Sequence, residues 1–281
     1  MNASIDKQSS IARAAEAIRH ADALLLGAGA GMGVDSGLPD FRGNAGFWTA
    51  YPALYGMQFH EVANPRWFAN DPAFAWGFYG HRLNLYRQTT PHDGFAILRR
   101  WAQSMSAGYF VFTSNVDGQF QKAGFPENRL IECHGSIHHL QCVNACNNAV
   151  WPVGDLKLEI EESTLRCSSP LPRCPECDRI ARPNILMFGD AGWLDQRSAE
   201  QYEQYQLWKR SLTGKSIVAI EIGAGMAIPT VRYFCEAEST THIRINPHEH
   251  EIAPPGIPLS MGALAGLVSI DAELRSISAF A

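Results

Sequence analysis

Three polar residues follow apolar runs that predict buried strands, and their side chains are the ones best suited to chemistry. Asn115 and Asp117 come after the run 109–112, and His134 follows the run 130–133. Ligands of α/β sheets bind at the carboxyl ends of parallel strands. An imidazole also suits general-base work, because its ordinary pKa of about 6.5 lies near neutral pH. Taken singly, Asn115 and Asp117 fit an Asx-turn equally well, and His134 fits a structural role.

A glycine-rich loop, residues 27–33, follows another apolar run. Glycines at this place let backbone N–H groups approach a pyrophosphate. The G-x-G-x-x-G spacing of hydride-transferring dehydrogenases is absent, because neither Gly27 nor Gly29 is followed by a glycine five residues later. The loop therefore fits a dehydrogenase poorly, and a glycine-rich turn that binds no ligand is the alternative.

Four cysteines form two closely spaced pairs, Cys142-x3-Cys146 and Cys174-x2-Cys177, separated by 27 residues. Short spacings let two thiolates reach one tetrahedral ion, and a second pair completes the site. A closed site of this kind predicts one structural Zn²⁺ that takes no part in chemistry. The alternative is four unrelated buried cysteines, and Cys167 is the substitute ligand if one of the four is not used.

The other cysteines and histidines have no partner pair nearby. Cys133 and Cys235 lie in a predicted strand and a predicted helix, and we expect both in the core. The neighbouring histidines are expected in solvated loops: His138, His139, His248 and His250.

The elements that must position these residues alternate between strands and helices. Short apolar runs predict strands at 23–26, 109–112, 130–133, 185–188, 217–222 and 242–245. Asp71-Pro72 predicts the start of an aromatic-rich helix that ends near Arg87. Such alternation predicts a parallel sheet covered by helices on both faces. Residues 137–182 break the alternation and are interpreted as an inserted module.

The overall composition argues against several classes of protein. The chain has 281 residues, of which 46% are apolar, so disorder is ruled out as its main state. Its 23 Lys and Arg against 28 Asp and Glu argue against a nucleic-acid-binding surface. Its longest nearly apolar stretch is far shorter than the ~20 residues of a membrane-spanning helix, and the charged N-terminus does not fit a secretory signal. We therefore expect a cytoplasmic protein with no membrane or nucleic-acid partner.

A second motif comes directly after the glycine loop. Gly29-Ala30-Gly31 followed by Gly-Leu-Pro-Asp-Phe-Arg at 37–42 resembles the NAD-binding segments of the sirtuin family, with the same spacing. Further segments resemble sirtuin motifs in the same order along the chain: 113–118, the His-Gly segment 133–136, 187–190, 223–225 and 245–247. The resemblance covers residues 23–270.

The resemblance implies an α/β fold with a Rossmann-like NAD-binding domain and a small zinc-bearing domain. The NAD-binding domain would consist of residues 1–50, 88–136 and 183–281. The helical insertion 51–87 and the zinc-binding module 137–182 would form the small domain.

The resemblance also implies NAD-dependent removal of acyl groups from protein lysines. In that reaction the acyl oxygen attacks the ribose carbon of NAD as nicotinamide leaves, and the acyl group ends on ADP-ribose. His134 would act as general base on a ribose hydroxyl, while Asn115 and Asp117 orient the ribose and a water. The substrate peptide would bind as an added strand near Phe188 and Gly189. The residues implied to bind NAD are Gly29, Ala30, Gly31, Asp40, Phe41, Arg42, Ser114, Asn115, Asp117, Gly223, Ala224, Gly225 and Asn246.

Three positions depart from the sirtuin pattern beside the NAD site. Ser114 replaces a usual glutamine, Phe120 a frequent histidine and Gly225 a serine, so all three bear on NAD affinity. The Gly-Ala-Gly-Ala-Gly run also resembles the macrodomain-associated sirtuins, which look like ADP-ribosyltransferases but lack the asparagine and histidine found here. An ADP-ribosyltransferase or NAD glycohydrolase is therefore one alternative, and a non-catalytic NAD sensor is another.

Tyr79 and Arg82 lie at i and i+3 of the aromatic-rich helix, on one face. They resemble the Tyr-x-x-Arg pair of sirtuins that remove succinyl, malonyl or glutaryl groups. The guanidinium would hold the distal carboxylate of the acyl group through paired, charge-assisted hydrogen bonds. The alternative is an ordinary surface arginine beside a core tyrosine.

Overall fold

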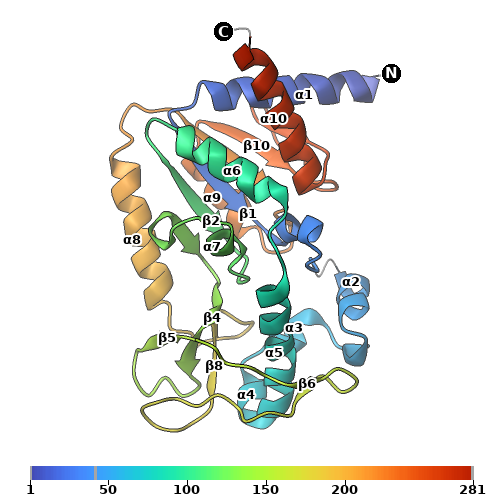
Figure 1. Ribbon diagram of the computed structural model, residues 1–281, viewed down its shortest axis with the longest axis vertical. Coiled ribbons are helices and arrows are strands. Elements are labelled where there is room, and N and C mark those ends of the chain that lie inside the picture. The colour runs from blue at the N-terminus through green and yellow to red at the C-terminus, as the bar shows by residue number, and fades with distance from the viewer. Residues whose placement is uncertain (1, 41–42, 280–281) are drawn as a thin grey trace.

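The computed structural model describes residues 2–40 and 43–279, and Figure 1 shows a larger and a smaller lobe along its long axis. The larger lobe contains a six-stranded sheet in which all neighbouring strands are parallel, as predicted. Its strands in spatial order are β11 (Ile257–Leu259), β10 (Thr241–Ile245), β9 (Ile217–Ile222), β1 (Ala23–Ala28), β2 (Tyr109–Thr113) and β3 (Leu130–Glu132).

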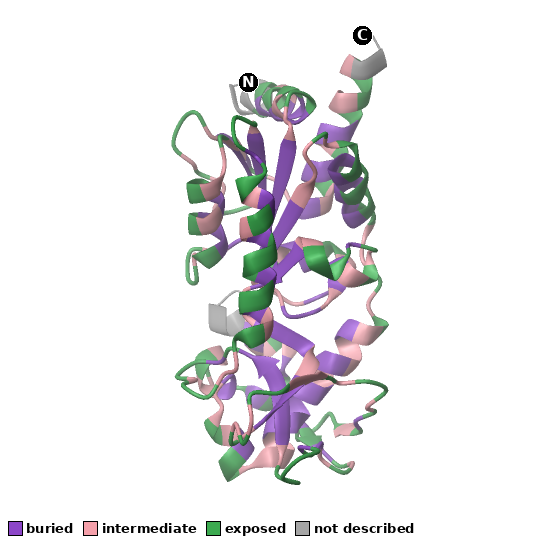
Figure 2. Cartoon of the chain, turned by 90° about the vertical axis from the view of Figure 1, so that its left-hand side faces the viewer, coloured by how far each residue is buried: buried purple, intermediate pink, exposed green. Residues whose placement is uncertain are grey.

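Helices cover both faces of this sheet because alternate residues of its strands point to opposite sides. Leu24 and Leu26 of β1 join one apolar cluster, whereas Ala23 and Leu25 join another. The sheet strands are consequently buried along their length (Figure 2). The first cluster is completed by α1 (Asn2–Arg19), α6 (Asp93–Ser104) and α10 (Ala263–Ala279), and the second by α8 (Gln196–Arg210) and α9 (Thr230–Glu238).

The smaller lobe surrounds a three-stranded antiparallel sheet in the order β5 (Val150–Pro152), β4 (Gly135–Cys142) and β8 (Ala181–Ile185). Short helices and the long α5 pack around it: α2 (Gly43–Ala50), α3 (Phe59–Val62), α4 (Arg66–Asn70) and α5 (Pro72–Gln88). The hairpin of β6 (Ile160–Glu161) and β7 (Arg166–Cys167) lies against α5. Gly77 of α5 permits this contact, because a Cβ there would lie 1.8 Å from the backbone oxygen of Leu165.

The start of α5 is confirmed. The side chain of Asp71 accepts a hydrogen bond from the N–H of Phe74 at 3.2 Å, and Pro72 occupies the first turn. Asp71 therefore satisfies one of the free N–H groups of the helix end, and proline lacks the N–H that would otherwise be left unsatisfied.

The predicted strand at 185–188 is wrong. Residues Ala181–Ile185 form β8 instead, and this strand pairs antiparallel with β4 in the smaller lobe. The polar residues and the proline of β8 break the apolar pattern, so the sequence does not indicate this strand. It forms because its backbone pairs with β4. The predicted domain boundary at residue 182 thus falls within β8.

Four short helical segments complete the chain: η1 (Ala30–Ser36), η2 (Pro52–Leu54), α7 (Gln119–Lys122) and η3 (Glu127–Arg129). No helix within residues 2–40 or 43–279 is long and apolar enough to cross a membrane.

Candidate cofactor-binding and catalytic site

The glycine loop after β1 packs directly against the backbone of the loop after β9. A Cβ at Gly29 would lie 2.6 Å from the Cα of Ala224, and one at Gly31 would lie 2.7 Å from the Cα of Gly223. The N–H of Gly31 donates to the oxygen of Gly223 at 3.0 Å. Gly223 itself has φ +62, a conformation that favours glycine. The two Gly-Ala-Gly segments therefore form one backbone cradle at the carboxyl ends of neighbouring strands.

Asn115 lies on this cradle. It follows β2, and its side-chain N–H donates to the oxygen of Gly29 at 2.9 Å, while Ser114 donates its N–H to Ala28 at 3.1 Å. The hydroxyl of Thr113 accepts the N–H of Asn115 at 3.0 Å. The predicted cofactor residues of β1 and β2 thus lie in contact with one another.

Asp117 is buried at the start of α7. Its Oδ1 accepts the N–H of Gln119 at 2.9 Å, which is the Asx-type contact that the sequence also allowed. Burial raises the pKa of Asp117 to about 6, although this hydrogen bond lowers it. The ring of His138 lies 3.0 Å from the Asp117 backbone oxygen and holds that turn from β4. Asp117 therefore changes protonation close to neutral pH.

His134 follows β3, at the same edge of the sheet. Burial lowers the pKa of this imidazole, and a hydrogen bond to the backbone of Ser114 opposes the change. The ring is consequently neutral at pH 7 and able to accept a proton. The next residue, Gly135, has φ +77, and a Cβ there would lie 2.0 Å from the oxygen of Asn184. Gly135 therefore permits a close backbone contact at the point where the chain leaves the large sheet and enters β4.

The predicted peptide-binding residues lie in the loop after β8, which begins where Leu186 donates its N–H to the oxygen of His134 at 3.0 Å. Phe188 is 37% exposed and packs edge-on against Phe59 at 5.9 Å. Gly189 has φ +69. Asp190 is buried and forms an ion pair with the equally buried Arg182 at 2.8 Å. The partly exposed ring of Phe188 therefore lies on a loop whose first residue, Leu186, is hydrogen-bonded to the backbone of His134.

Tyr79 and Arg82 both lie in the interior, so the surface-arginine alternative is wrong. The Arg82 guanidinium lies over the ring of Tyr79 at 5.9 Å and over that of Tyr86 at 5.4 Å. Its Nε donates to the hydroxyl of Tyr86 at 2.9 Å. Burial raises the pKa of Tyr79 above its usual range, so its hydroxyl remains a donor. Helix α5 thus brings the guanidinium of Arg82 and the phenol rings of Tyr79 and Tyr86 together in one buried cluster.

The far end of the cradle contains Gly223, Gly225 and Asn246. Asn246 is fully buried, and its side-chain N–H donates to the oxygen of Ala224 at 3.0 Å. Its Oδ1 accepts the N–H groups of His248 and Glu249, each at 3.0 Å. In this arrangement the Asn246 amide joins the loops after β9 and β10. Asp40 is half-buried, whereas Phe41 and Arg42 lie outside the described residues.

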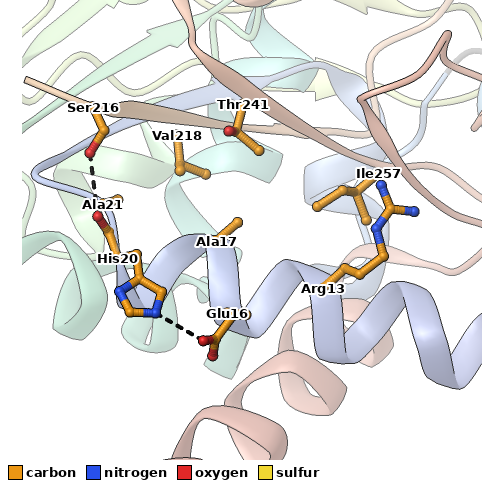
Figure 3. A pocket seen from close by; sticks show the side chains of 9 residues that line it. All are labelled: Arg13, Glu16, Ala17, His20, Ala21, Ser216, Val218, Thr241 and Ile257. Carbon is orange, nitrogen blue, oxygen red and sulfur yellow. Dashed lines mark hydrogen bonds and ion pairs between the residues drawn. The ribbon is translucent and has the colours of Figure 1, made fainter.

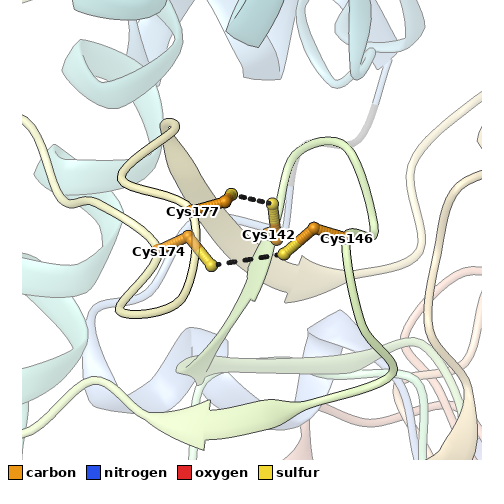
Figure 4. Close-up of side chains that lie close together, drawn as sticks. All are labelled: Cys142, Cys146, Cys174 and Cys177. Carbon is orange, nitrogen blue, oxygen red and sulfur yellow. Dashed lines mark hydrogen bonds between the residues drawn. The ribbon is translucent and has the colours of Figure 1, made fainter.

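The four predicted zinc ligands converge in the smaller lobe (Figure 4). The sulfurs of Cys142 and Cys177 lie 3.6 Å apart, as do those of Cys146 and Cys174, and all four sulfurs lie within 4.8 Å of one another. Tetrahedral Zn–S bonds of about 2.3 Å would place sulfurs about 3.8 Å apart, so the donor set fits Zn²⁺.

Cys142 belongs to the cluster, and Cys167 lies outside it. Burial raises the pKa of the Cys142 thiol, but the backbone N–H groups of Cys146 and Asn144 and the thiols of Cys177 and Cys146 together lower it to about 7. Cys167 instead contacts the hydroxyl of Ser169 at 3.4 Å. Cys235 lies in the core as expected, whereas Cys133 directly follows β3 and is half-buried against the core, so its predicted place is wrong.

His138 and His139 differ from their expected place in a solvated loop, because both lie half-buried on β4. His139 has its pKa lowered to about 4, mainly by burial. Together with Asp117 they line a hollow of about 340 Å³. His248 and His250 lie in a loop, as predicted.

A second hollow, of about 370 Å³, lies between α1 and the amino ends of β9 and β10 (Figure 3). Arg13, Glu16 and His20 line it, and Glu16 and His20 are paired at 2.8 Å. It contains none of the predicted site residues and lies at the opposite end of the sheet strands from them.

Sequence reasoning missed the charged residues that lie behind the cradle. Glu221 of β9 is buried and forms ion pairs with the buried Arg232 of α9 and Arg244 of β10. Glu221, a charged residue inside the apolar run 217–222, was the sequence feature that could have indicated this buried cluster. The sequence alone does not reveal its partners, because they are 11 and 23 residues away.

Comparison with known proteins agrees with this geometry. A model of the Sir2 family matches residues 29–209. An NAD-dependent protein deacylase of Pyrococcus abyssi is 30% identical over 229 residues, covering 80% of this chain and 82% of that protein. One of Aquifex aeolicus is 29% identical over 227 residues, covering 80% and 83%.

A likeness to solved structures shows the same fold. The crystal structure of a Sir2 homolog–NAD complex superposes with a TM-score of 0.69 at 23% identity and covers 94% of both chains. With a matching family model over most of its length and a relative of this similarity, the chain belongs to the Sir2 family, the sirtuins.

Proposed function

We propose that this protein is an NAD-dependent protein lysine deacylase that transfers the acyl group to ADP-ribose and releases nicotinamide. The observation that carries the proposal is that Asn115 donates a hydrogen bond to Gly29 of the double glycine cradle, and that His134 contacts the backbone of Ser114 beside it. The cradle fits NAD, because its glycines leave backbone where side chains would stand. When bound, NAD supplies the ribose carbon and hydroxyl that receive the acyl group.

The proposal gives each predicted site residue a defined role. His134 accepts a proton from the ribose hydroxyl, for which its neutral imidazole is suited. Asn115 and Asp117 orient the ribose and a water, and the loop of Phe188 and Gly189 receives the extended acyl-lysine peptide. Zn²⁺ held by the four cysteines would stabilise the smaller lobe and take no part in the reaction.

We further propose a preference for acidic acyl groups such as succinyl or malonyl. Arg82 supplies a buried positive charge and Tyr79 a hydroxyl, and both come from the same face of α5. A distal carboxylate would gain a charge-assisted hydrogen bond that acetyl lacks. Acetyl-lysine has no distal carboxylate and would not gain this bond.

Nicotinamide release measured with a panel of acyl peptides tests both proposals. A deacylase releases nicotinamide only when acyl peptide is present and forms O-acyl-ADP-ribose in equal amount. Release without peptide would favour an NAD glycohydrolase, and labelling of protein by ADP-ribose would favour a transferase. Binding of NAD without any release would favour a sensor.

A further inference from the structure

Glu221 is a charged residue in the interior of the sheet. Its side chain has no exposed surface, although it lies on β9 between two apolar residues. Arg244 of β10 binds it through two hydrogen bonds of 2.8 and 2.9 Å, and His242 Nε2 lies 2.9 Å away. Burying ionic groups is costly, and such pairs often add little to stability compared with apolar residues. A role other than stability therefore has to be considered for this group.

Arg232 connects the buried carboxylate to the cradle. Its Nε lies 3.7 Å from Glu221 Oε1, and its side chain is only 4% exposed. From this position Nε and Nη2 donate to the oxygen of Ala224 at 3.2 and 2.8 Å. Nη2 also donates to the oxygen of Glu249 at 2.6 Å. One guanidinium thus links the loop after β9 to the loop after β10.

Further polar contacts reinforce the same link. The oxygen of Ala224 also accepts the side-chain N–H of Asn246, so it receives three donors. The Glu249 carboxylate accepts the N–H of Met226 at 3.1 Å. Between them lies Gly225, which stands where sirtuins usually have serine; a Cβ there would lie 3.7 Å from Glu249 Oε2. The loop around Gly225 is therefore held by the side chains of Arg232, Asn246 and Glu249.

We propose that Arg232, held in place by Glu221, is a positioning residue for NAD: it fixes the loops 223–225 and 246–249 in the shape that binds the cofactor. This inference rests on the proposed function, because it assigns these loops to the NAD site. Arg232 acts through the backbone of Ala224 and Glu249 and not through the reacting atoms. Its loss should therefore weaken NAD binding while leaving the affinity for acyl peptide unchanged.

The test compares Arg232→Met, Arg232→Lys and the control Arg100→Met. Arg100 pairs with Asp271 on the opposite face of the same sheet, away from both loops. For each zinc-loaded variant we would measure the Kd of NAD by calorimetry, the KM of NAD and of acyl peptide, and the melting temperature without ligand. A hydrogen bond to a charged group supports an expected rise in the NAD Kd of about 10- to 100-fold for Arg232→Met. Arg232→Lys keeps the positive charge but loses the guanidinium that binds both loops, so the NAD Kd should rise less than in Arg232→Met.

The outcomes separate positioning from simple stabilisation. A higher Kd and KM for NAD with an unchanged KM for peptide supports the proposal. If Arg232→Met does not fold, the same selective loss in Arg232→Lys supports it. An NAD Kd within threefold of wild type in folded Arg232→Met overturns it, as does a Kd that rises equally in Arg100→Met. If wild type binds no NAD, the proposed function fails and this inference fails with it, whereas a loss confined to the Arg232 variants leaves the proposed function intact.

Discussion

The larger lobe and the cysteine-containing module of the smaller lobe are stabilised by different means. Apolar side chains on both faces of the six-stranded sheet form two clusters in the larger lobe. In residues 143–180 the buried apolar side chains other than cysteine are Leu158, Leu165 and Pro172. Among the described residues, the non-glycine residues with φ between 44 and 56 all lie in this module: Ala145, Leu165 and Asp178.

This difference shows where metal is needed. A lobe with a large apolar core can fold through burial alone. The module adds few fully buried side chains to the apolar cluster of the smaller lobe and has unfavourable backbone angles, so it depends on a further source of free energy. Four converging thiols provide it when they bind Zn²⁺. Substitutions of the proposed catalytic residues in the larger lobe should therefore alter chemistry with little effect on folding. Substitutions of the zinc-binding cysteines should lower stability and leave the chemical step intact.

The largest effect is expected from His134→Ala. Loss of a general base typically lowers the rate by ~100 to 10,000-fold, and we expect this loss in the rate of acyl removal. NAD affinity, zinc content and melting temperature should remain close to wild type, because the substitution removes one half-buried ring at the edge of the sheet. His139→Ala, at a half-buried histidine of β4, is the matched control. Retention of more than about a tenth of the wild-type rate would contradict the assignment of His134.

Removal of a zinc ligand tests how far the cysteine-containing module depends on metal for its stability. Cys142→Ser is expected to lose bound zinc and to lower the melting temperature, because the site is closed and structural. Cys167→Ser is the control, since Cys167 contacts Ser169 and not the cluster. Metal analysis of both purified variants checks this. Zinc retained in Cys142→Ser but lost in Cys167→Ser would refute the ligand set.

Asp117→Asn, in the larger lobe, should lower the rate of acyl removal while raising stability at pH 7. Burial raises the pKa of Asp117 from 3.8 to about 6. The unfolded chain therefore binds fewer protons than the folded chain between these pH values, and wild-type stability falls as pH rises through this window. The charged side chain would cost up to ~3 kcal/mol at pH 7.

The asparagine variant should be more stable than wild type at pH 7, and this gain should disappear as pH falls from about 6 to 4. Acyl removal should nevertheless be impaired. Thermal unfolding at several pH values, together with rates at pH 7, measures both effects. A variant that is less stable than wild type at pH 7 would contradict the role of burial.

The smallest effect is expected from Arg82→Met, which concerns substrate choice. If Arg82 binds a distal carboxylate, the loss of one charged hydrogen bond of ~1.5 to 3 kcal/mol lowers kcat/KM for succinyl peptide by about 10- to 150-fold. The value for acetyl peptide should change far less. The two specificity constants are measured with peptides that differ only in the acyl group. A wild-type preference for acetyl, or an unchanged ratio in the variant, would reject the acidic pocket.

Local spacing was sufficient to predict the zinc ligands and the glycine-rich loop. Cys142 and Cys146 can reach one ion because three residues separate them, and residues 27–33 form a glycine-rich loop directly after an apolar run. The start of α5 at Asp71 was likewise readable, because capping depends on a hydrogen bond to a residue three positions away. Such features depend on neighbours in the chain, so the order of residue types already contains them.

Tertiary structure alone decided the features whose partners lie far apart in the sequence. Residues 181–185 became a strand of the smaller sheet because β4 offered them backbone hydrogen bonds. His138 was expected in a solvated loop, but it lies on β4 and contacts the turn of Asp117. Glu221 is tolerated in the core because Arg244 and Arg232 reach it from β10 and α9. A buried charge is acceptable only when its partners have been brought to it, and the folded chain alone provides that proximity.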